Sequence, residues 1–139
     1  MFKKITIGVI VLILVFIHSP NISAEAEKEV VTKTIPELVD FYADAYNVSS
    51  TQMMAVMKCE NNTLDTNLQS RLKYSRDNSR WGVVAGQREE SYGLVQIHLP
   101  DHPHISKEQA TNPEFAIEFM AQEFSKGRAS KWTCYRKLY

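Results

Sequence analysis

The pattern of apolar positions predicts a short helix over residues 50–60, and it places an acidic residue on the apolar face of that helix. The apolar positions recur at i, i+3 and i+4, and Glu60 follows at i+7. Ser49 and Gln52 have the spacing of a capping box at the start of the helix, and two asparagines at 61–62 close it. The apolar residues that share this face with Glu60 are Met53, Val56 and Met57.

A second helix is predicted from residue 35 to about Asn47. Thr34 and Glu37 have capping-box spacing, and Pro36 lies in the first turn, where a missing N–H costs nothing. The apolar face of this helix is Leu38, Phe41, Tyr42 and Ala45.

A third helix is predicted after Asn112 and Pro113, with Gly127 following its end. Its inward stripe is Ile117, Met120, Ala121 and Phe124, and a polar stripe is predicted to form a solvated face. That polar stripe is Glu114, Glu118 and Gln122.

Residues 63–88 lack helical periodicity and predict a short hairpin or an irregular flap around residues 81–84. Irregular segments of this length are often functional. The predicted fold class is therefore mainly α, with one short irregular or hairpin segment beside the helices.

The N-terminus has the composition of a secretory leader. Lys3 and Lys4 precede an apolar run over residues 5–17, which suits a signal-peptide core and is too short for a comfortable membrane span. An A-x-A pattern at residues 24–26 follows. We expect a signal peptide over residues 1–26, a charged spacer over 27–34 and one domain over 35–139. A retained membrane anchor is the alternative.

Length and charge exclude several classes of protein. The chain has 139 residues, 44% of them hydrophobic, which suits one compact domain. Its formal net charge is zero, so the charge gives no indication of electrostatic binding to nucleic acid. No glycine-rich phosphate loop, zinc-finger spacing or heptad repeat occurs in the sequence. We expect a monomer that is exported to the cell envelope or secreted, with no stable membrane partner.

The position of Glu60 suits a general acid. Desolvation beside the apolar face and the partial negative charge at the end of the helix both favour the protonated carboxyl. A carboxyl that keeps its proton near neutral pH is what general-acid catalysis requires. The alternative is a glutamate that extends to solvent from the helix end.

Two short motifs resemble those of a known family. The first is Lys58-Cys59-Glu60, and the second runs over residues 90–97 with the sequence ESYGLVQI. In this order and spacing they resemble the lytic transglycosylases and goose-type lysozymes of the lysozyme-like superfamily, over roughly residues 35–135. The resemblance implies a lysozyme-like α+β fold, a glycan cleft, peptidoglycan strands as the binding partner, and no cofactor.

The resemblance also implies roles for individual residues. Glu60 matches the catalytic acid and base of the family, and Gln96 matches a glutamine whose amide reaches the sugar near the scissile bond. Gln96 capping a turn is the alternative for that residue. Gly93 is expected to let the backbone approach the ligand or to adopt positive φ.

The remaining matches to the family are looser. Ser70 lies one residue beyond the family spacing, and Tyr135 matches the first residue of a late Tyr-Asn pair but is followed by arginine. Tyr92 and Trp81 are candidates for stacking on a sugar face, with burial in the core as the alternative for each.

Export gives the two cysteines a meaning. Within the chain, Cys59 and Cys134 can form a disulfide only with each other. In an oxidising compartment we therefore expect a bridge that joins the end of the chain to the helix of Glu60. Two buried thiols and a nucleophilic cysteine are the alternatives.

Three histidines, His98, His102 and His104, surround Asp101 and raise the possibility of a metal site. Prolines at 100 and 103 interrupt the segment, so the helical His-x-x-x-His arrangement is absent. We expect a rigid loop at the edge of the cleft, and no metal.

The expected function is peptidoglycan cleavage. A hydrolase normally uses two carboxylates, and Asp65 is the nearest second acid in the sequence, although nothing in its setting marks it. The resemblance implies a single-acid route, that of a lytic transglycosylase, with a lysozyme-type hydrolase as the alternative. A catalytically silent glycan-binding module and an envelope structural protein remain as further hypotheses.

Overall fold

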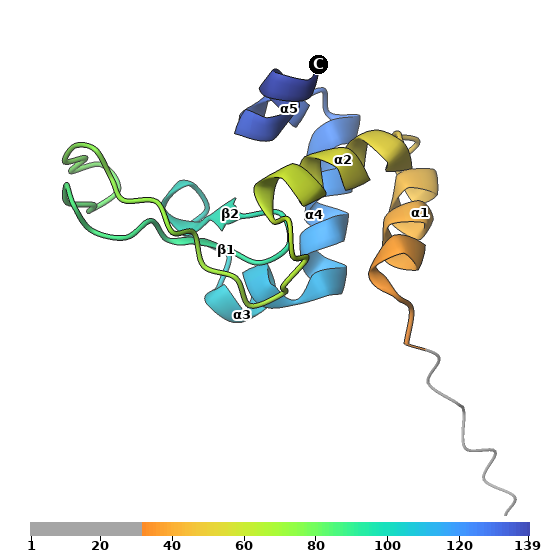
Figure 1. Cartoon of the computed structure of the whole chain (residues 1–139), viewed down its shortest axis with the longest axis horizontal. Helices are drawn as coiled ribbons and strands as arrows, with labels where there is room; N and C mark the ends of the chain where they lie inside the picture. Colours follow the sequence, from red (N-terminus) through yellow and green to blue (C-terminus); the bar gives the residue numbers. More distant parts are fainter. Residues whose placement is uncertain (1–31) are drawn as a thin grey trace, which may run out of the picture. The chain divides into compact units, whose positions relative to one another are not determined.

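The computed structural model describes residues 32–139, so the predicted signal peptide and most of the predicted spacer lie outside the described residues. Within this part of the chain the fold is mainly helical, with five α-helices and one short antiparallel hairpin (Figure 1), which confirms the predicted fold class. The elements are α1 (Ile35–Ala45), α2 (Ser50–Glu60), β1 (Ser91–Tyr92), β2 (Ile97–His98), α3 (Lys107–Thr111), α4 (Pro113–Ser125) and α5 (Thr133–Leu138). Two 3₁₀ turns cover Leu99–Asp101 and Ala129–Lys131.

The first two helices begin where their capping residues predicted. The Thr34 backbone N–H donates to Glu37 at 2.7 Å at the start of α1, and the Gln52 N–H donates to Ser49 Oγ at 3.2 Å at the start of α2. Helix α1 ends at Ala45, slightly before the predicted Asn47, which instead has a left-handed φ of 52°.

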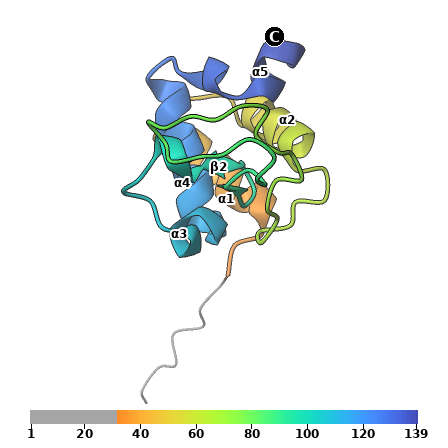
Figure 2. The ribbon, with the colours of Figure 1, turned by 90° about the vertical axis from the view of Figure 1, so that its left-hand side faces the viewer.

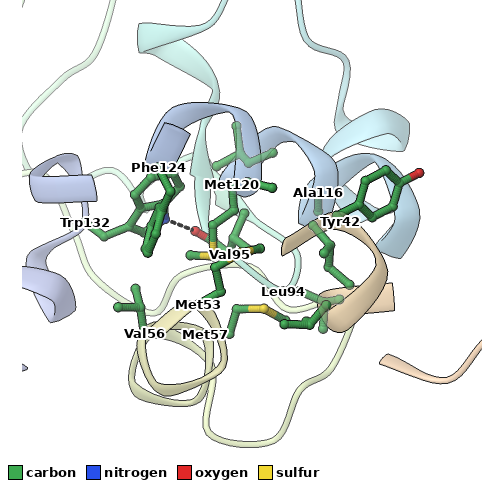
Figure 3. Packing of buried hydrophobic residues seen from close by; sticks show 14 of the residues in the cluster. Tyr42, Met53, Val56, Met57, Leu94, Val95, Ala116, Met120, Phe124 and Trp132 are labelled. Atoms are coloured by element: carbon green, nitrogen blue, oxygen red, sulfur yellow. Dashed lines mark hydrogen bonds between the residues drawn. The ribbon is translucent and has the colours of Figure 1, made fainter. Parts of the chain in front are cut away.

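The core lies between α2, α4 and the turn that joins β1 to β2. In Figure 3 the Val95 side chain lies between Met53 of α2 and Met120 of α4, Leu94 lies near Met57, and all five residues are buried. Trp132 closes one end of this layer, because its indole N–H donates to the Val95 carbonyl at 2.7 Å. These contacts therefore hold the β1–β2 turn against the buried face of α2.

The polar stripe of α4 faces α1, and the prediction of a solvated face holds for Glu114, which is exposed, whereas Glu118 and Gln122 are partly buried. The Tyr46 hydroxyl donates to Glu118 Oε1 at 2.7 Å and accepts from Gln122 Nε2 at 3.0 Å. The Tyr42 hydroxyl donates to Glu114 at 3.2 Å. Burial, with the Glu114 charge as the second cause, raises the pKa of Tyr42 to about 12. The stripe is a polar seam between two helices.

Residues 71–88 form an irregular hairpin, which we call the flap. Two isolated antiparallel bridges, Lys73 with Arg88 and Asn78 with Val83, hold its two sides together. Figure 1 shows it extending away from the helices, and Figure 2 shows the molecule from the side of the flap. Trp81 lies on it and is 38% exposed. No helix within residues 32–139 is long and apolar enough to cross a membrane.

Candidate active site

A cavity of about 1040 Å³ lies between the C-terminal end of α2, the base of the flap, the β1–β2 hairpin and α5. This volume is at the upper end of the roughly 300–1,000 Å³ typical of small-molecule sites. Of the glycan-site candidates and cysteines singled out in the sequence, six line it together: Cys59, Glu60, Ser70, Trp81, Gln96 and Cys134.

Glu60 is the last residue of α2 and is partly buried. Its Oε1 accepts a hydrogen bond from the backbone N–H of Cys134 at 2.9 Å. Cys134 is the second residue of α5, so this N–H is one of the donors at a helix start that have no acceptor within the helix. Glu60 thus caps α5 as well as facing the cavity.

The second carboxylate oxygen of Glu60 is open. No group within residues 32–139 donates to Oε2, and no unpartnered side-chain oxygen in this part of the chain is buried. One oxygen is therefore held by the protein, while the other is free to exchange a proton with a bound molecule. This arrangement lies between the two readings of the sequence, a buried acid and a glutamate extended to solvent.

The predicted disulfide is present, and it forms part of the cavity wall. Cys59 and Cys134 are bonded, with 5.8 Å between their Cα atoms. The bridge joins the residue next to Glu60 to the residue whose N–H binds the Glu60 carboxylate. Both partners in this contact are thereby fixed to one another covalently.

Gln96 caps a turn, as the alternative interpretation of the sequence expected, and it also lines the cavity. Its Nε2 donates to the carbonyls of Gly93 at 2.9 Å and Leu68 at 3.3 Å, so the amide closes the β1–β2 turn. Its Oε1 accepts no bond within the described part of the chain and is not buried. Because Gln96 lines the cavity, this oxygen is an acceptor that is open on the cavity side.

Gly93 and Tyr92 lie outside the cavity lining. Gly93 has the expected positive φ, 78°, but its close neighbour is α3, because a Cβ at this position would lie 2.0 Å from the Ala110 carbonyl oxygen. Tyr92 is 8% exposed and packs in the core. Successive residues of a strand point to opposite faces, and its neighbour Ser91 is the one that lines the cavity.

Tyr135 also lies outside the lining. The residues of α5 that face the cavity are Thr133, Cys134 and Lys137, so Tyr135 points from a different face of the helix. Its ring packs against Phe124, with 5.6 Å between ring centroids. The late tyrosine therefore stabilises the docking of α5.

Ser70 lines the cavity, and its Oγ donates to Glu89 Oε2 at 3.2 Å. Glu89 is a second carboxylate in the cavity, and the sequence reasoning missed it. Asp65, the second acid suggested by the sequence, is exposed and lies outside the lining. Glu89 lies just before the two-residue strand β1, outside any regular element, so no periodic signal in the sequence marks it.

A hydrogen-bonded chain of three side chains lines the flap end of the cavity. His98 Nδ1 lies 2.9 Å from Asp101 Oδ2, and His98 Nε2 lies 3.0 Å from the Tyr74 hydroxyl. In the neutral tautomer whose Nδ1 donates to Asp101, Nε2 is the acceptor for the Tyr74 hydroxyl. Burial is the largest cause that raises the pKa of Tyr74. Trp81 packs edge-on against His98, with ring centroids 5.6 Å apart.

The histidine segment does not assemble a metal site in the described part of the chain: no group of three or more histidine, cysteine, aspartate or glutamate side chains is placed to hold an ion. His102 lines the cavity, and burial, with Lys131 as the second cause, lowers its pKa. His104 is exposed and outside the lining. The segment forms an edge of the cavity, as expected.

Comparisons of the chain with models of protein families, with curated proteins and with solved structures find no match.

Proposed function

We propose that this chain is an exported enzyme that cleaves peptidoglycan, and that it acts as a lytic transglycosylase on the β-1,4 bond between N-acetylmuramic acid and N-acetylglucosamine. The observation that carries this proposal is the setting of Glu60. One carboxylate oxygen is anchored by the Cys134 amide, and the other is open to a cavity of about 1040 Å³. A general acid needs such a fixed but accessible oxygen.

The proposed reaction uses Glu60 twice. Its carboxyl first donates a proton to the glycosidic oxygen as the bond to the anomeric carbon breaks. The resulting carboxylate then takes the proton of the 6-hydroxyl of the same muramyl sugar, whose oxygen attacks the anomeric carbon with help from the acetamido group. The product has a 1,6-anhydro end, and Glu60 regains its proton.

Other groups in the cavity suit an N-acetylated sugar. Gln96 Oε1 is an open acceptor for an acetamido N–H or a hydroxyl. Trp81 and Tyr74 present aromatic surface at the flap end, where the apolar face of a sugar ring packs well. These contacts also support the simpler alternative, a glycan-binding module without turnover.

A hydrolase of the lysozyme type is the second candidate function, and Glu89 favours it. Glu89 lines the same cavity as Glu60 and supplies the second carboxylate that glycoside hydrolysis normally uses. In that case Glu89 would act as nucleophile or as base, and the product would have a reducing end.

Mass spectrometry of the soluble products from purified cell wall distinguishes these candidates. A transglycosylase releases fragments that are lighter than the hydrolytic fragments by one water. Incubation in ¹⁸O-labelled water leaves those fragments unlabelled, whereas a hydrolase introduces the label. Reducing-end, labelled fragments as the main product would overturn the transglycosylase proposal, and binding with no fragments would indicate the silent module.

We further propose a monomer that acts in the envelope or outside the cell after its leader is removed. The disulfide supports an oxidising compartment, since such bridges persist mainly there.

A further inference from the structure

Glu60 belongs to a closed ring of bonds. The carboxylate accepts from the Cys134 N–H, the Cys134 sulfur is bonded to the Cys59 sulfur, and Cys59 is joined to Glu60 by the peptide bond. Two of these three links are covalent. The position of the donor relative to the carboxylate is therefore set by the disulfide.

Two anchors besides Glu60 hold that donor at the N-terminal end of α5: the bridge at Cys134, and the buried Trp132, whose indole N–H donates to the Val95 carbonyl. Helix α5 spans six residues, and helices this short are marginal without tertiary support. Its N-cap residue, Trp132, makes no side-chain capping bond, so the side-chain acceptor at the helix start is Glu60, and the bridge ties the donor residue to the chain next to that acceptor. The Tyr135 ring supports the helix through Phe124 but does not line the cavity.

We propose that Cys59 and Cys134 are positioning residues for the catalytic carboxylate, and that cleavage of glycan requires the oxidised bridge for reasons beyond stability. This inference rests on the proposed function. A misplacement of about 1 Å in a catalytic group can cost about 100-fold in rate, so loss of the bridge is expected to lower kcat while leaving glycan binding largely unchanged.

Reduction of the Cys59–Cys134 bridge by a dithiol tests the same inference without a substitution. A thiolate of the dithiol attacks one sulfur of the bridge, and the second thiol then closes the dithiol into a cyclic disulfide. Two electrons and two protons pass to the protein, which gains two thiols. Cys59 is exposed and the bridge lines the cavity, so a small dithiol can reach it.

The test compares a variant carrying both Cys59→Ser and Cys134→Ser with Val39→Ala. Val39 is 1% exposed in α1, outside the lining of the cavity, and its truncation is expected to destabilise the fold with the bridge intact. The cysteine variant is expected to lose about 10- to 100-fold in kcat. Its dissociation constant for glycan is expected to stay within about threefold, measured with Glu60→Gln added to stop turnover. Val39→Ala is expected to keep its kcat.

Each outcome supports or overturns the positioning role of the bridge. An unchanged kcat in the folded cysteine variant, or an equal fall in Val39→Ala, overturns the inference and leaves the proposed function standing. No cleavage by the oxidised wild-type chain overturns both. If the cysteine variant unfolds, an osmolyte that favours the compact state restores it, and both variants are then assayed in that osmolyte. Wild type treated with dithiol should match the cysteine variant, and the cysteine variant should not respond to dithiol.

Discussion

Replacing Glu123 with glutamine should destabilise the fold in a way that depends on pH. Glu123 lies on α4 with 5% exposure and is bonded to Arg128 Nε and to Lys131 Nζ, each at 2.7 Å. The hydrogen bonds from Arg128 are the largest cause that lowers the pKa of Glu123 from 4.5 to about 2. A pKa that falls on folding means that the native state favours the ionised carboxylate.

The size of the effect follows from this shift. At 1.36 kcal/mol per pKa unit the shift corresponds to about 3 kcal/mol of stability. The side chains of Arg128 and Lys131 are 42% and 48% exposed, so solvent screening should lower the contribution to about 2 kcal/mol. This stability is fully present above pH 4.5 and is lost as the pH falls toward 2.

The pH-dependent contribution of Glu123 to stability is measured by urea unfolding of wild type and Glu123→Gln at several pH values between 7 and 2. The free energy of unfolding should differ by about 2 kcal/mol at pH 7, and the difference should shrink as the pH falls from 4.5 toward 2. Equal stabilities at pH 7, or a difference that stays constant with pH, would refute the reasoning.

Three further predictions concern the turn, the core and the second acid. Gly93→Ala should lower the free energy of unfolding in urea by about 3 kcal/mol, because its Cβ meets the backbone of α3. Gly86→Ala is the control, since Gly86 has a similar φ but open space around it, and it should cost about 1 kcal/mol. Trp132→Phe should cost about 2 kcal/mol by thermal unfolding, since it leaves a buried carbonyl without its donor. In a transglycosylase, Asp65→Asn and Glu89→Gln should each change kcat/KM by less than about tenfold; a loss of 100-fold or more in Glu89→Gln alone would indicate the hydrolase.

The sequence predicted those parts of the fold that local patterns specify. Helix α2 and the bridge from Cys59 followed from periodicity, capping residues and the count of cysteines. The partial burial of Glu118 and Gln122 on α4 was not predicted, because nothing local shows that Tyr46, the residue after α1, bonds to both. Which element packs against a polar helix face depends on the tertiary fold, and the residue pattern of one helix does not specify it.

The site was predictable where a residue ends a regular element and unpredictable where the backbone is irregular. Glu60 ends a helix, so its face could be read from spacing. Tyr92 and Ser91 are neighbours in a two-residue strand, too short for alternation to show which one faces the cavity. The contact of Tyr74 with His98 joins the flap to the hairpin across 24 residues, and no periodic signal marks it.

The most direct test of the central claim is to measure cleavage and binding of purified peptidoglycan with the same preparations of wild type and Glu60→Gln. The glutamine keeps an oxygen that can accept from the Cys134 N–H, so the cap of α5 and the fold should survive, but it cannot donate and recover a proton. We expect release of soluble fragments to fall by about 10²- to 10⁴-fold while binding to the glycan stays near that of wild type. Activity of Glu60→Gln within about tenfold of wild type would contradict the assignment of Glu60 as the catalytic acid.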